Sequence, residues 1–326
     1  MTKFSAHRLP PWHEVAGIRS PRLLRPFGRY WIKHLTWRPY RRTALSGPVH
    51  PGRQGLRLKS RIASYDSVVN LMLDGYTALS GHRPAPATGP LVVVFNRLVG
   101  AFDDEFEDRV DAKRPLGFDE VLGSPEVHAR LTDLRTFLEP HESRDAIRGY
   151  LIDSAAKQYG RYVELLTDGP ADPEQQLDSR FEAAMIDSSG FLVSLARVIS
   201  LFNGVGSDEA VLDQFATLGI VGKIADDVVD FWTDARSDRF NLLDGFVRLH
   251  PAEFAVTRAV LANPPRTGLR WWSRHCPQSI AALSEALAGQ MDQLTEPALR
   301  RAGQVMLAPA MWGHTVLKSG PASGRL

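Results

Sequence analysis

The stretch 218–243 places three aspartates at intervals of four residues, Asp226, Asp230 and Asp234, with Asp227 beside the first. On a helix this spacing gives an acidic stripe, and apolar residues fill the positions between its members. Like charges one turn apart destabilise a helix, and burying carboxylates is costly unless a cation neutralises them. Oxygen-only ligands favour a hard cation, which predicts Mg²⁺. The simpler alternative is a solvated helix face, although such faces usually interleave Lys with Glu.

A second acidic cluster follows an apolar run within residues 91–111. It contains Asp103, Asp104, Glu107 and Asp108, which pair at helical spacing of four residues. Two apolar helices that each carry such a cluster could face one another and hold metal between them. Mg²⁺ is usually held by one or two carboxylates together with substrate phosphate oxygens. The two clusters therefore predict a phosphorylated substrate.

At these residues the chain resembles the class I isoprenoid synthase superfamily, which includes trans-prenyl diphosphate synthases and class I terpene synthases. The string 103–108, DDEFED, resembles the first aspartate-rich motif of that family, and 226–230, DDVVD, resembles its second. The spacing of Asp226, Asp230 and Asp234 is equally similar to the metal-binding triad of terpene synthases. The motifs lie about 123 residues apart, similar to the family spacing, and the resemblance covers roughly residues 60–320.

The resemblance implies an all-α helical bundle around a deep apolar cavity, the isoprenoid synthase fold. It implies a cluster of up to three Mg²⁺ ions that binds a prenyl diphosphate, farnesyl or geranylgeranyl. The implied metal ligands or their immediate support are Asp103, Asp104, Glu107, Asp108, Asp226, Asp227, Asp230 and Asp234. The implied diphosphate contacts are Arg180, Lys223, Arg239, His314 and Lys318. Asp104, Asp227, Lys223 and Gly190 are the candidate catalytic residues, and Gly190 is the last residue of a predicted helix interruption at 187–190.

Departures from the family select between its two activities. Ser188 stands where elongating enzymes carry the Lys of Lys-Thr-Gly, and Lys223 stands where they carry Gln before the second motif. The Gly-Gly-Lys-x-x-Arg-Pro signature for isopentenyl diphosphate has no convincing counterpart. We therefore expect a terpene synthase that ionises one C15 or C20 prenyl diphosphate to a hydrocarbon or alcohol. The alternatives are a trans-prenyl diphosphate synthase and a non-catalytic homologue that binds a partner synthase. The second alternative is disfavoured because a structural subunit need not keep carboxylates unpaired.

The elements that must position these residues read as helices, with no convincing strand. Apolar periodicity predicts helices at 62–79, 118–139, 143–166, 173–203, 251–263, 277–294 and 296–318. It also predicts a helix through the first motif that ends or is interrupted at 115–117, and a helix that starts at 207–208 and carries the second motif. Pro90 suits the first turn of the helix that carries the first motif. Ser207 or Asp208 can cap the helix that carries the second. The catalytic domain is expected at 61–320.

Residues 1–60 are expected to form a basic, partly irregular arm rich in Pro and Gly. Residues 1–61 carry a net charge of +13, so the remaining chain carries −11 of the overall +2. Nucleic-acid binding is disfavoured because no such motif is present and the remainder is acidic. No apolar run is long enough for a membrane span, and the sole cysteine, Cys276, excludes an intramolecular disulfide. A cytoplasmic enzyme is expected, and the resemblance allows a homodimer.

Overall fold

The computed structural model describes residues 69–167, 172–237, 239–265 and 269–312, and every regular element in these ranges is helical. Residues 69–80 form a helix. It is followed by α5 (Thr88–Asp111), α6 (Phe118–Leu122), α7 (Pro125–Leu138), α8 (Arg144–Thr167), α9 (Pro173–Ala184), the π-helical turn η2 (Met185–Ser189), α10 (Gly190–Phe202), α11 (Glu209–Ser237), α12 (Leu242–Arg248), α13 (Pro251–Val260), α14 (Leu269–His275), α15 (Pro277–Gln293) and α16 (Pro297–Trp312). The all-α class predicted from the sequence is confirmed.

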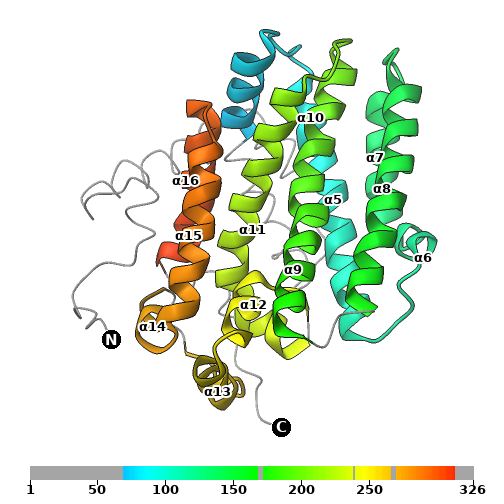
Figure 1. Cartoon of the computed structure of the whole chain (residues 1–326). Coiled ribbons are helices and arrows are strands. Elements are labelled where there is room, and N and C mark those ends of the chain that lie inside the picture. The colour runs from blue at the N-terminus through cyan, green and yellow to red at the C-terminus, as the bar shows by residue number, and fades with distance from the viewer. Residues whose placement is uncertain (1–68, 168–171, 238, 266–268, 313–326) are drawn as a thin grey trace.

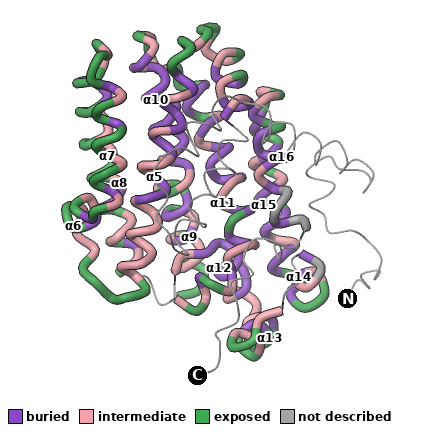
Figure 2. The backbone as a smooth tube through the Cα atoms, turned by 180° about the vertical axis from the view of Figure 1, so that it is seen from behind, coloured by how far each residue is buried: buried purple, intermediate pink, exposed green. Residues whose placement is uncertain are grey.

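The long helices run side by side, and the short helices α12, α13 and α14 gather at one end of the bundle (Figure 1). Helix α11 is the organising element, since it packs against α10, α12, α15, α16 and the π turn. Buried residues concentrate along α10 and α11, whereas α7 and α8 keep an exposed outer face (Figure 2). The second acidic motif therefore lies on a helix that neighbouring helices enclose on several sides.

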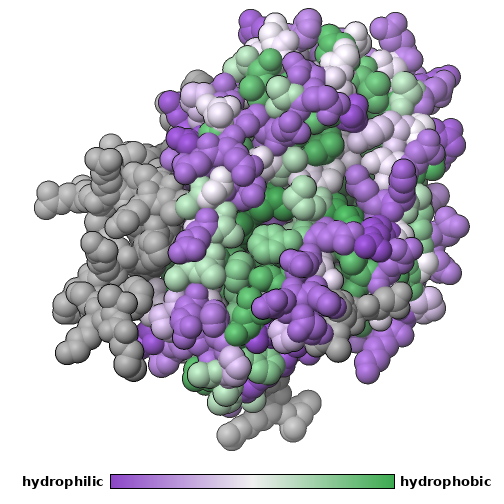
Figure 3. Space-filling model, viewed as in Figure 1, coloured by the Kyte–Doolittle hydropathy of each residue, from purple (hydrophilic) through white to green (hydrophobic). Residues whose placement is uncertain are grey.

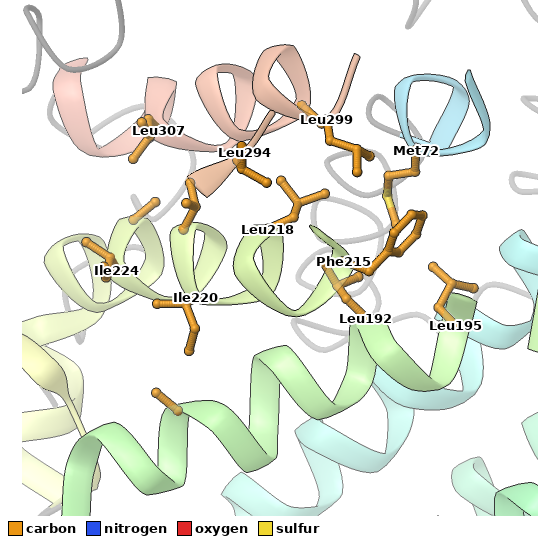
Figure 4. Packing of buried hydrophobic residues seen from close by; sticks show 14 of the residues in the cluster. Met72, Leu192, Leu195, Phe215, Leu218, Ile220, Ile224, Leu294, Leu299 and Leu307 are labelled. Carbon is orange, nitrogen blue, oxygen red and sulfur yellow. The ribbon is translucent and has the colours of Figure 1, made fainter. Parts of the chain in front are cut away.

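The apolar core lies between α11 and the helices on either side of it. Figure 4 shows side chains of α11 meeting those of α16 on one side and those of α10 on the other. The labelled members are Met72, Leu192, Leu195, Phe215, Leu218, Ile220, Ile224, Leu294, Leu299 and Leu307, all buried. On the face viewed in Figure 3, apolar side chains also reach the surface in the middle, over α11 and α12, with polar residues around them. A deep cavity remains a prediction.

Local sequence accounts for most helix boundaries. Pro90 lies in the first turn of α5, as predicted, and Asp208 accepts a hydrogen bond from the backbone N–H of Ala210 (2.8 Å) at the start of α11. The single helix predicted at 118–139 is wrong. The structure has two helices, because Ser124 is extended (ψ 144°) and Pro125 begins a new helix. Helices α12 and α14 were not predicted, since seven residues carry too little periodicity.

The stretch Pro173–Phe202, which joins α9, η2 and α10, is long and apolar enough to cross a membrane by length and composition. Half of its most apolar window is buried inside the bundle, and its helices pack against α8, α11 and α12. A core helix meets the same criterion, so the stretch is weak evidence for a span. It is compatible with the expectation that the chain has none.

Cys276 lies at the N-cap of α15 with no exposed surface. Burial raises the pKa of its thiol to about 12, and the charge of Glu253 adds to this effect. Glu253 itself is buried and accepts hydrogen bonds from the backbone N–H groups of Gln278 (2.8 Å) and Ser279 (2.9 Å). The carboxylate thus satisfies the first turn of α15 in place of a side chain at the N-cap.

Candidate functional site

The first acidic motif lies on the C-terminal half of α5, and its four carboxylates are half-buried. The apolar N-terminal half of α5 is buried and so fixes the helix in the bundle. Arg109 pairs with Glu105 (2.7 Å) and donates to the carbonyls of Pro115 (3.0 Å) and Glu120 (2.8 Å). Arg109 therefore holds the turn between α5 and α6.

The second acidic motif is divided between two faces of α11. Asp226 is exposed, whereas Asp227 and Asp234 are 0% and 7% exposed. Seven residues are nearly two full helical turns, so Asp227 and Asp234 share a face, and Lys223 lies one turn before Asp227 on that same face. The buried polar stripe is therefore Lys223, Asp227 and Asp234, with Asp230 half-buried at its edge.

Asp227 holds the chain that follows α11. Its Oδ2 accepts the backbone N–H of Leu242 at 2.6 Å, at the start of α12. Asn241 is the N-cap of α12 and accepts the N–H of Asp244 (3.1 Å). The same Asn241 side chain donates to the Asp227 carbonyl and to Asp234 Oδ2, both at 2.8 Å. Sequence reasoning missed Asn241, although Asn before Leu-Leu-Asp is a recognisable cap signal.

Lys223 is the positively charged member of the buried stripe, and it faces carboxylates on α11 and η2. Its Nζ lies 3.0 Å from Asp227 Oδ1 and 3.7 Å from Asp187 Oδ2 on the π turn. Burial lowers the pKa of Lys223, but the charges of Asp227 and Asp187 outweigh that effect and raise it well above its ordinary value. The ammonium is thus charged and balances carboxylates from α11 and η2. The expected role of Lys223 as a diphosphate contact stays a prediction.

The two buried carboxylates of α11 hold their protons more tightly than ordinary aspartates. Burial raises the pKa of Asp227 to about 6, although Lys223 and the Leu242 N–H act in the opposite direction. Burial raises the pKa of Asp234 to about 7, against the lowering effects of Lys223 and Asn241. At Asp227 burial outweighs the attraction of its cation, whereas at Lys223 the attraction of several carboxylates outweighs burial, so both partners have a raised pKa.

Arg239 connects the two motifs. It follows α11 and reaches α5, where its guanidinium lies 2.9 Å from Glu107 Oε2 and 2.8 Å from Asp111 Oδ2. Burial lowers the pKa of Arg239, but Glu107 and Asp111 outweigh this and raise it. Its Nε is buried without a hydrogen-bond acceptor among the described residues. Arg239 is thus a fixed positive charge at the junction of both acidic segments, with one donor left over.

The predicted interruption near Gly190 is present as a π turn, η2, between α9 and α10. The chain stays helical there, but the turn is wider by one residue. Gly219 of α11 permits the turn to approach closely, since a Cβ there would lie 2.5 Å from the Ser188 carbonyl oxygen. Ser189 Oγ donates to the Ala216 carbonyl at 2.9 Å. Gly190 itself faces the flexible side chain of Gln158, which a Cβ would meet at 3.0 Å.

Arg180 lies in a buried ion pair. Its Nη2 is 2.9 Å from Asp244 Oδ2 on α12, and its Nη1 donates to the Asn241 carbonyl at 3.3 Å. Arg248 shares the same Asp244 oxygen at 2.7 Å. The contacts of Arg180 with the 241–244 segment fix α9 against α12. Its expected role as a diphosphate contact stays a prediction.

Tyr162 on α8 lies near enough to charged groups of both motifs for its pKa to be affected by them. The charges that act on its phenol come from Asp187, Lys223, Asp103 and Asp227, in that order of effect. They lie on η2, α11 and α5. Burial, supported by Asp187, raises the pKa of Tyr162. Tyr162 was missed because a single Tyr in a helix carries no sequence signal of its own.

The donor set fits Mg²⁺ in its chemistry, since it consists of carboxylate oxygens. The buried Oδ1 of Asp227 already faces the Lys223 ammonium at 3.0 Å, so the half-buried carboxylates of α5 and Asp230 are better placed to accept a metal cation. Within the described residues, no three acidic, imidazole or thiol side chains already form a metal-binding group. The reasoning that the motifs stay unpaired is wrong, because Asp227 pairs with Lys223 and Glu107 pairs with Arg239.

The predicted diphosphate contacts His314 and Lys318, and the basic arm at 1–60, lie outside the described residues. The other predicted site residues lie on α5, on α9 to α10, or on α11 and the segment after it. The chain matches no protein-family model, and a search of curated proteins gives no match. The resemblance to isoprenoid synthases therefore rests on the sequence alone, mainly on its two acidic motifs.

Proposed function

We propose that this chain is a Mg²⁺-dependent class I terpene synthase that ionises a C15 or C20 prenyl diphosphate. The observation that carries the proposal is the convergence of two acidic segments about 123 residues apart. The charges of Asp103 in the first segment and Asp227 in the second both affect the pKa of Tyr162. Arg239, which follows α11, pairs with Glu107 on α5. Ordinary packing does not require acidic segments to meet in this way.

The residues that would hold Mg²⁺ are the half-buried carboxylates of α5, together with Asp226 and Asp230 of α11. Asp227 and Asp234 are so enclosed that they suit a supporting role beside those ligands. When bound, Mg²⁺ polarises the diphosphate leaving group. Lys223 and Arg239 supply fixed positive charge where the leaving diphosphate gains negative charge, and the buried Nε of Arg239 has a donor to offer.

The apolar parts of the same helices would enclose the prenyl chain. Phe95 of α5 stacks on Phe191 of α10, with ring centroids 5.7 Å apart. Aromatic faces attract cations, and apolar walls exclude the water that would quench an allylic cation. Val99 and Phe102 continue this side of α5 toward the acidic motif. This arrangement supports cyclisation or proton loss after ionisation.

The deciding experiment uses the purified full chain with Mg²⁺ and geranyl, farnesyl or geranylgeranyl diphosphate, each with and without isopentenyl diphosphate. We expect a hydrocarbon or alcohol that extracts into hexane, formed from one prenyl diphosphate alone and abolished by EDTA. Accumulation of a longer prenyl diphosphate would replace the proposal with the elongase.

A matched pair of variants tests the site itself. We expect Asp104→Asn to lower kcat at least about a hundredfold, since it removes a ligand charge that stabilises the transition state. Asp119→Asn, an exposed carboxylate on α6, is the control and should keep normal turnover. Equal activity of the two variants would contradict the assignment of the first motif.

A second candidate function is a non-catalytic homologue that binds a partner synthase. The observation that favours it is the internal pairing of the motifs, because Lys223 and Arg239 already neutralise Asp227 and Glu107. This candidate predicts no Mg²⁺-dependent binding of inorganic pyrophosphate by the isolated chain. Calorimetric titration of Mg²⁺ and pyrophosphate into the protein distinguishes it from the terpene synthase, which should bind both.

A further inference from the structure

Tyr162 occupies an unusual position on α8, between the two halves of the candidate site. Its ring meets Phe106 of α5 edge-on, with centroids 5.6 Å apart, and meets Phe240, which follows α11, at 5.7 Å. Phe106 lies within the first acidic motif and Phe240 lies next to Arg239. These two aromatic contacts fix the ring, and so the direction of the hydroxyl, at the junction of both motifs.

The hydroxyl of Tyr162 differs from that of Tyr159, one turn earlier on the same helix. Tyr159 donates a hydrogen bond to the Leu116 carbonyl at 2.7 Å, whereas the Tyr162 hydroxyl makes none with the residues that the structure describes. Tyr159 contacts the same Phe106 ring at 5.7 Å. The two tyrosines thus share a helix and an aromatic neighbour, but only the Tyr159 hydroxyl forms a hydrogen bond with the described residues.

The charged groups that affect Tyr162 lie on three different elements of the candidate site. Asp103 lies on α5, Asp187 on η2, and Lys223 and Asp227 on α11. Each of these groups is one that the proposed function assigns to the metals or the diphosphate, or that pairs directly with such a group. A diphosphate bound beside Asp103 and Lys223 would therefore come close to the phenol.

We propose that Tyr162 is a substrate-binding residue whose hydroxyl donates a hydrogen bond to an oxygen of the metal-bound diphosphate. This inference rests on the proposed function and names a contact that the sequence motifs do not contain. A phenol is protonated at neutral pH, so it donates without adding another charge to a site that already contains Lys223 and Arg239. A donor whose ring is held by two aromatic contacts loses little entropy on binding.

Tyr162→Phe and Tyr159→Phe test this inference as a matched pair. Wild type and both variants are titrated with inorganic pyrophosphate in the presence of Mg²⁺ by calorimetry, and their thermal unfolding is followed without ligand. We expect Tyr162→Phe to keep the wild-type Tm, because no hydrogen bond of the resting protein is lost, and to bind pyrophosphate about tenfold more weakly or worse. Tyr159→Phe should show the reverse pattern, with a lower Tm and unchanged affinity.

The outcomes separate this inference from the proposed function. If wild type binds pyrophosphate with Mg²⁺ and Tyr162→Phe binds it equally well, Tyr162 is packing only and the inference alone is overturned. If both tyrosine variants lose affinity in proportion to a loss of stability, the effect is structural and the inference also fails. If wild type does not bind pyrophosphate at all, the proposed function falls and the inference falls with it.

Discussion

Asp227 belongs to the second acidic motif and also makes structural contacts. Removing its side chain therefore affects two partners, Leu242 and Lys223. Its carboxylate is fully buried, holds the Leu242 N–H and faces the Lys223 ammonium. Breaking a buried ion pair by removing one partner typically costs about 3–5 kcal/mol, because the other charge stays buried without compensation. An alanine at 227 would therefore leave the Leu242 N–H without its acceptor and the Lys223 ammonium without its nearest carboxylate.

We predict that Asp227→Ala lowers the free energy of unfolding by ~3 kcal/mol, measured by urea denaturation in EDTA. The matched control is Asp226→Ala, its exposed neighbour on the same helix, which should change stability by less than about 0.5 kcal/mol. Asp227→Asn should lie between them, since it keeps an oxygen for Leu242. Equal stability of the two alanine variants would show that Asp227 does not anchor the end of α11.

At the scale of elements, the close contact between α11 and the π turn requires a residue without a side chain at position 219. A Cβ on Gly219 would lie 2.5 Å from the Ser188 carbonyl oxygen and 2.6 Å from the Ser189 Cα. Both are backbone atoms, so one of the two helices would have to move. This contact fixes Asp187 beside Lys223 and therefore belongs to the site as well as to the fold.

We predict that Gly219→Ala destabilises the protein by about 1–3 kcal/mol, measured by thermal or urea unfolding. The control is Gly160→Ala on α8, where a Cβ meets no atom within 4 Å. Alanine is the better helix former, so the control should gain up to about 1 kcal/mol. If Gly219→Ala is as stable as that control, the close packing of η2 on α11 is not tight.

The sequence predicts most of the helices and both acidic motifs, because long periodic segments and charge clusters are local signals. It does not predict which carboxylates are enclosed. The spacing of Asp226, Asp230 and Asp234 is typical of one stripe, whereas the structure buries Asp227 and Asp234 and exposes Asp226. A shift of one residue rotates a helix position by about 100°, and only packing against α12 and η2 decides it.

Contacts between distant segments were equally out of reach of the sequence. Arg239 forms an ion pair with the Glu107 carboxylate and donates a hydrogen bond to the Glu107 carbonyl, although the two residues are 132 positions apart. The roles of Asn241 and of the Tyr162 hydroxyl depend on neighbours on other helices, which the local sequence does not reveal. The sequence thus supplies the chemical groups, and the tertiary fold decides which of them meet.

At the scale of the whole molecule, the enclosed carboxylates make stability depend on pH. The pKa of Asp234 is about 7 in the folded chain against an ordinary value of 3.8. The folded state therefore binds this proton more tightly than the unfolded state. Stability is highest below pH 4 for this group and is lost as pH rises toward and through 7. A shift of about three units corresponds to at most ~4 kcal/mol.

We predict that Asp234→Asn removes this pH dependence in the metal-free protein. In EDTA the variant should be more stable than wild type by at least ~1 kcal/mol at pH 8, and the difference should shrink toward pH 5. The amide keeps an oxygen for Asn241, so the hydrogen bond that wild type makes is preserved. Parallel urea midpoints at both pH values would contradict the raised pKa.

The enclosed thiol at the start of α15 gives the molecule an internal reporter of its own opening. Cys276 is the only cysteine in the chain, has no exposed surface and has a pKa of about 12, so alkylating reagents find almost no thiolate in the native state. Labelling therefore has to wait for an opening event, and its rate relative to a free thiol measures how often this part of the bundle opens. Any ligand that binds only the closed bundle should slow the reaction in proportion to its occupancy, which would reveal binding without a substrate assay.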